Sequence, residues 1–110
     1  MLSVLLAVSK DGLLRRFEAH GHTGADWGRN VACAAATILL RTTHHACKER
    51  GMVALRSATH PGEMTMVLEE RTGTHGEWLR GVTDFLVRGM SDLEREFPDQ
   101  VALLVETTED

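Results

Sequence analysis

Two short apolar runs separated by polar turn residues make up the first twenty positions of the chain. The runs cover residues 2–9 and 13–20, and Lys10, Asp11 and Gly12 lie between them. An Asp-Gly pair between apolar runs is typical of the turn in an antiparallel hairpin. We therefore expect two paired strands at residues 2–9 and 13–20.

The next apolar segment has the composition of a helix. Asn30 is a favoured N-cap residue, alanines crowd the turns that follow it, and Gly51 interrupts the pattern at the far end. We predict a helix over residues 31–49. Its small residues at the start suit close packing against a sheet.

A second pair of strands is expected at residues 52–57 and 63–69. The turn-forming residues His60, Pro61 and Gly62 lie between them. Beyond this pair, Thr74 and Glu77 have the spacing of a capping box at the start of a helix. The sequence therefore predicts a second hairpin followed directly by a second helix.

Apolar residues then recur at steps of three and four up to Pro98, which predicts an amphipathic helix that ends before this proline. The recurring residues are Trp78, Val82, Phe85, Leu86, Leu93 and Phe97. We expect the apolar group of Trp78, Phe85 and Met90 to belong to the core rather than to a binding surface. Residues 100–106 contain five successive apolar positions, 101–105, and are predicted to form a well-buried strand.

These elements occur in the order β-β-α-β-β-α-β. Two helices on one face of a mostly antiparallel sheet form a two-layer sandwich, so the fold class is α+β. At 110 residues, the chain is the size of one domain, residues 1–110. A small sheet leaves edges uncovered, which favours self-association.

Composition and charge exclude several functions. A net charge of −4 and a pI near 5.8 argue against direct nucleic-acid binding, which needs a clustered basic face. The N-terminal apolar run lacks a preceding basic region and is too short to span a bilayer, so we expect neither a signal peptide nor a membrane segment. No cofactor-binding motif is present, and we expect no cofactor.

The two cysteines, Cys33 and Cys47, lie on the same predicted helix. At 1.5 Å per residue their separation is about 21 Å, too far for a disulfide. Two thiols suit a reducing compartment, so a cytoplasmic location is expected.

Cys33 is the candidate nucleophile. It lies near the third position of the predicted helix, where the first-turn N–H groups and the helix dipole favour a thiolate. His22 precedes it by eleven residues, and Gly24 and Gly28 allow the intervening loop to fold back towards the sulfur. Without the histidine, the default interpretation is a small core cysteine among alanines.

Residues 21–37 read Gly-His-Thr-Gly-Ala-Asp-Trp-Gly-Arg-Asn-Val-Ala-Cys-Ala-Ala-Ala-Thr. This segment resembles the signature of the ribosomal-processing cysteine proteases: Gly-His-Ala, a short glycine-containing loop, Gly-x-Asp-Ile-Val-Cys-Ala, and a Ser four residues after the cysteine. The matching positions are Gly21, His22, Gly28, Cys33 and Thr37. Chain length and element order are also similar to those of the family.

The resemblance implies that Cys33 is the nucleophile and His22 its base. It further implies an endopeptidase that removes the N-terminal extension of a large-subunit ribosomal protein precursor during ribosome assembly, and a homodimer. Contact with the ribosome would then be made through protein.

The family's Asp is replaced here by Asn30. Both residues cap a helix, but the neutral amide cannot hold His22 as imidazolium, a role that Asp26 is a candidate to fill. Thr37 lies one turn beyond Cys33, where it is a candidate to orient the thiol.

Two other functions compete with the protease. His20, His22 and Cys33 could supply three ligands of a zinc site, although His-x-His with one distant Cys is a weak metal pattern. Alternatively, the chain is a non-enzymatic dimeric module that binds a ribosomal protein tail. No serine-nucleophile elbow and no phosphate-binding glycine motif is present.

Overall fold

The computed structural model describes residues 1–21, 31–53, 58–60, 63–69 and 74–109. The predicted element order is confirmed. In chain order the elements are β1 (Leu2–Val8), β2 (Leu14–His20), α1 (Val31–Glu49), β3 (Ala58–His60), β4 (Glu63–Val67), α2 (Gly76–Glu96) and β5 (Val101–Thr107).

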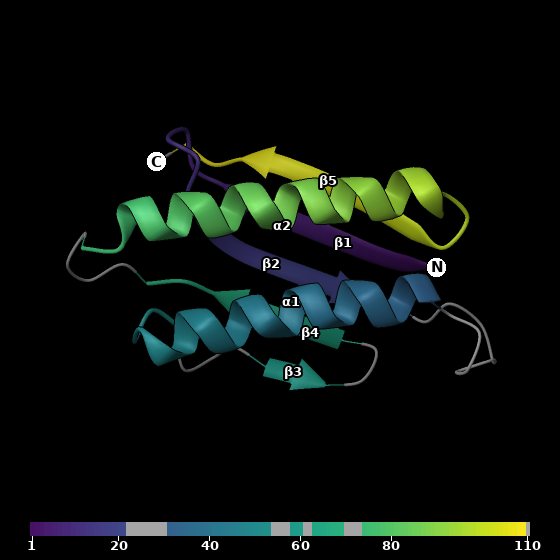
Figure 1. Cartoon of the computed structure of the whole chain (residues 1–110), viewed down its shortest axis with the longest axis horizontal. Helices are drawn as coiled ribbons and strands as arrows, with labels where there is room; N and C mark the ends of the chain where they lie inside the picture. The colour runs from purple at the N-terminus through teal and green to yellow at the C-terminus, as the bar shows by residue number, and fades with distance from the viewer. Residues whose placement is uncertain (22–30, 54–57, 61–62, 70–73, 110) are drawn as a thin grey trace.

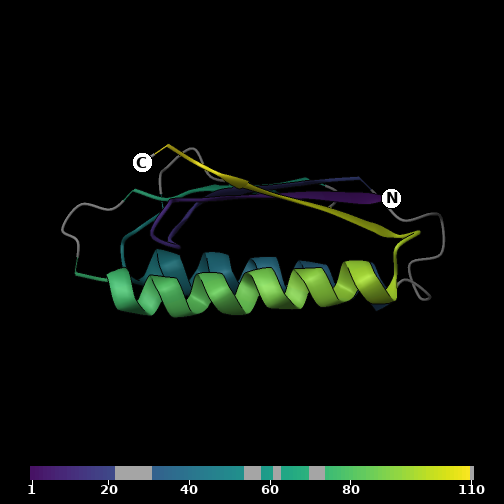
Figure 2. The same cartoon turned by 90° about the horizontal axis from the view of Figure 1, so that it is seen from above.

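The strands form one five-stranded sheet in the order β3-β4-β2-β1-β5. All neighbouring strands are antiparallel except β1 and β5, which are parallel. Both helices lie side by side on one face of this sheet (Figures 1 and 2). The predicted two-layer α+β sandwich with a mostly antiparallel sheet is therefore confirmed.

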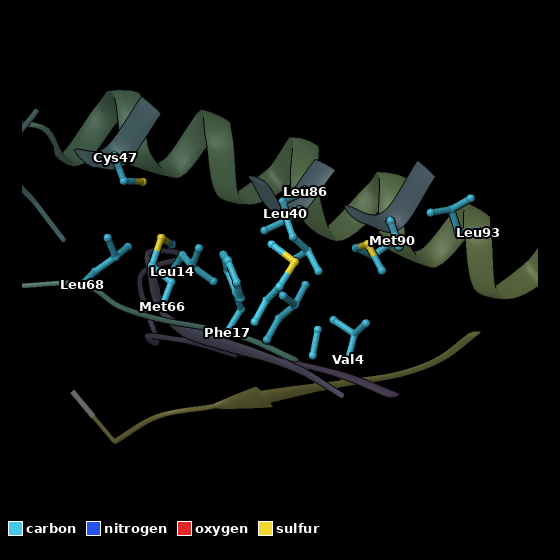
Figure 3. Close-up of a cluster of buried hydrophobic side chains, with 14 of the residues drawn as sticks. Val4, Leu14, Phe17, Leu40, Cys47, Met66, Leu68, Leu86, Met90 and Leu93 are labelled. Carbon is cyan, nitrogen blue, oxygen red and sulfur yellow. The ribbon is translucent and has the colours of Figure 1, made fainter. Parts of the chain in front are cut away.

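Strand register assigns alternate residues to the core. Val4 pairs with Ala19 and Leu6 with Phe17, and all four side chains are buried. Because successive strand residues point to opposite faces, these pairs define the helix-covered face. Figure 3 shows the sheet residues Val4, Leu14, Phe17 and Met66 directed towards Leu40, Leu86 and Met90 of the two helices.

The intervening residues define the other face of the sheet, here called the open face. Arg16, Ala7 and Glu106 lie in one row across β2, β1 and β5. The Arg16 guanidinium donates to the Glu106 carboxylate at 2.7 Å, above Ala7, which is fully buried. The open face is thus part apolar and part charged.

The strand predicted at residues 52–57 is described only at its first two residues. Val53 forms only an isolated bridge with Leu68, residues 54–57 lie outside the described part of the chain, and the paired strand is β3. His60 pairs with Glu63, so the ladder begins directly beside the turn signal. The sequence pattern thus located the turn of this hairpin correctly.

The predicted capping box is not formed. The N-cap of α2 is His75, which makes no side-chain capping bond, and the first helical hydrogen bond runs from the Leu79 N–H to the His75 carbonyl. Thr74 therefore precedes the cap position that the pattern assigned to it. Leu79, in the first turn, is fully buried and holds this end of α2 in the hydrophobic core.

Phe85 was also assigned wrongly. Its side chain is 71% exposed, whereas the buried positions of α2 are Leu79, Thr83, Leu86, Met90 and Leu93. Phe85 follows the same three- and four-residue steps but lies about 100° around the helix from Leu86. Met90 is buried as predicted, and Trp78 is half-buried beneath the Arg50 guanidinium, 3.7 Å from the ring centroid.

The prediction of a well-buried last strand is wrong beyond its first residue. Val101 is buried, but Leu104 is 60% exposed and Val105 is 42% exposed. The reason is position: β5 is an edge strand with β1 on one side only. A continuous apolar run is typical of a central strand, and this one lies at the border of the sheet.

Candidate active site

Cys33 is the third residue of α1, as predicted from Asn30 and the alanine run. Its side chain is half-buried and packs against the hydrophobic core from the first turn of the helix. The neighbouring Ala32 and Ala36 are fully buried, and their small side chains let this end of the helix approach the sheet closely. The sulfur is therefore held by the core without being sealed inside it.

Cys33 lies at the positive end of the α1 helix dipole. Positive partial charge collects at the N-terminus of a helix, where the first-turn N–H groups point out of the helix end. The first turn of α1 contains no acidic residue that would oppose this effect. The first turn of a helix without acidic residues is a position at which nucleophilic cysteines occur.

Gly21 directly follows β2 and contacts the start of the chain. Its φ is +109°, and a Cβ atom built on it would lie 2.3 Å from the carbonyl oxygen of Met1. Any side chain at this position would therefore collide with backbone. The contact explains why the Gly of the motif is required here, and sequence reasoning did not find it because no local pattern links residues 1 and 21.

The end of β2 and the start of α1 lie at the same end of the molecule as the N-terminus (Figure 1). Gly21 and Val31 thus flank the motif loop from the sheet and from the helix. The other predicted members of the site lie outside the described residues: His22, Gly24, Asp26, Gly28 and Asn30. Their roles stay predictions.

Thr37 lies four residues after Cys33 in the same helix and is half-buried. Residues at this spacing are neighbours on one side of a helix. Thr37 therefore lies, relative to Cys33, where the family motif has its hydroxyl residue.

Cys47 differs from Cys33 in burial and in its position along α1. It is fully buried near the other end of α1, and burial raises the pKa of its thiol to about 11. Both cysteines, which belong to the described part of the chain, are thiols rather than a disulfide pair. Cys47 is a core residue and Cys33 is the candidate nucleophile.

The position of His20 does not favour the zinc alternative. His20 follows core-facing Ala19 in β2, so it points to the open face, where its Nδ1 lies 4.0 Å from the Glu63 carboxylate. Cys33 belongs to the helix layer on the opposite side of the sheet. Among the residues that the structure describes, no group of three His, Cys, Asp or Glu side chains is placed to hold a metal ion.

Cys33, the candidate nucleophile, thus lies at the start of a helix in a protein of the α+β class with a small mixed sheet. The sequence profile of one family, described as cysteine protease Prp, matches residues 1–102. The chain therefore belongs to the Prp family of cysteine proteases. No significant match was found among curated proteins.

Solved structures share the fold. SMU.848 from Streptococcus mutans is similar with a TM-score of 0.78 and 23% identity, over 98% of this chain and 96% of that one. The ribosomal processing protease Prp from S. aureus is similar both in complex with a substrate peptide (TM-score 0.73, 15% identity) and with a covalently linked product peptide (0.75, 16%). Each of these two matches covers 96% of this chain and 100% of that one. In the ranges described for this chain, neither helix is long and apolar enough to cross a membrane.

Proposed function

We propose that this cysteine protease removes the N-terminal extension of a large-subunit ribosomal protein precursor during ribosome assembly. The observation that carries the proposal is the half-buried Cys33 thiol in the first turn of α1, in a chain that matches the Prp family over residues 1–102. The S. aureus relative that shares the fold is a ribosomal processing protease. The substrate assignment follows from that relationship.

In the proposed mechanism, the Cys33 thiolate attacks the peptide carbonyl and forms a tetrahedral intermediate. Collapse of the intermediate breaks the C–N bond, and His22, as imidazolium, gives a proton to the leaving amine. Water then hydrolyses the thioester and returns the thiol. Backbone N–H groups at the helix start, including that of Cys33, are the candidate oxyanion donors.

The remaining motif residues have supporting roles in this proposal. Gly21 and Gly28 shape the loop that carries His22, and Asn30 caps α1. Asp26 is the candidate carboxylate for His22, because Asn30 has no charge to offer. Thr37 orients the Cys33 thiol from the next turn of the helix.

The direct test is incubation of the purified protein with the ribosomal protein precursor, followed by intact-mass measurement. We expect wild type and the matched control Cys47→Ala to shorten the precursor, and Cys33→Ala to leave it unchanged. No mass loss with wild type would reject the assigned substrate. If Cys33→Ala kept the full biological effect, the non-enzymatic binding module would be the better account.

We also propose a cytoplasmic homodimer that acts without a cofactor and without direct nucleic-acid contact. Two thiols suit a reducing compartment, and the net charge of −4 disfavours binding to a polyanion. The incompletely covered sheet supports self-association. Mass measurement in solution tests the dimer independently of the cleavage assay.

A further inference from the structure

We draw no further inference here: the strongest candidate, the exposed apolar surface of the helix layer at Ile38 of α1 and Phe85 of α2, carries none because nothing in the described part of the chain shows what covers it.

Discussion

Substitution of Gly21 by alanine tests the contact that joins the start of the chain to the motif loop. Two costs arise at this position. A φ of +109° is strained for any residue with a Cβ atom, at roughly 1–3 kcal/mol. In addition, the new Cβ would lie 2.3 Å from the Met1 carbonyl oxygen, so the backbone must separate by about 1 Å to restore an ordinary contact.

Two other glycines separate these costs. Gly51 has a φ of +70°, and no atom lies within 4 Å of the position that an added methyl group would take, so Gly51→Ala carries the backbone strain without the collision. Gly81 lies in α2 with open space around it, so Gly81→Ala should stabilise the protein by about 0.5–1 kcal/mol through helix propensity. We expect Gly51→Ala to cost about 1 kcal/mol and Gly21→Ala about 3 kcal/mol.

The assay is urea unfolding of the three variants beside wild type, with thermal unfolding as a second measure. A loss of about 3 kcal/mol corresponds to a fall in Tm of more than about 10 °C for a domain of this size. Equal losses for Gly21→Ala and Gly51→Ala would show that the Met1 contact is not held in solution. If the proposed function is right, the peptidase kcat also falls, because Gly21 immediately precedes His22.

Two further predictions concern thiol reactivity and a buried hydroxyl. At pH 8, iodoacetamide should modify Cys33 alone in the native protein and Cys47 only after denaturation, because Cys47 is fully buried and the pKa of its thiol is about 11. Mass spectrometry of the labelled peptides measures this. Labelling of Cys47 in the native protein would contradict the described core. Thr83 accepts from the Leu14 N–H at 2.9 Å, so Thr83→Val should cost about 1–3 kcal/mol by leaving this buried donor unpaired. Thr43→Val should cost less than about 1 kcal/mol in the same unfolding assay, because the Thr43 hydroxyl donates to the Leu39 carbonyl of its own helix and, among the described residues, accepts no backbone N–H from the sheet. Equal losses for the two variants would count against the link between Thr83 and Leu14.

Local sequence signals were sufficient to predict the order of the helices and strands. The Asp-Gly turn, the alanine-rich segment and the apolar run before Pro98 each predicted an element that the structure contains, and α1 has the predicted bounds. These signals succeed because turn geometry, helix propensity and the proline constraint act within a few residues. The choice of Cys33 was equally local, since helix position and a sequence motif both depend on neighbours in the chain.

Errors arose where a residue's environment depends on distant parts of the chain. Phe85 has helix periodicity but faces solvent, because the direction of the sheet relative to α2 determines which side is buried. The apolar run in β5 does not reveal that, in the sheet formed by the described residues, β5 is the last strand and lies beside β1; this is a consequence of strand order.

By itself, the sequence determined the elements, the fold class and the candidate nucleophile, through interactions that span only a few residues. Tertiary structure alone decided that Cys47 is sealed in the core, that Gly21 touches Met1, and that Phe85 faces solvent. The physical reason is that burial and close contact are set by packing between segments far apart in the chain, and no local pattern encodes which segments will meet.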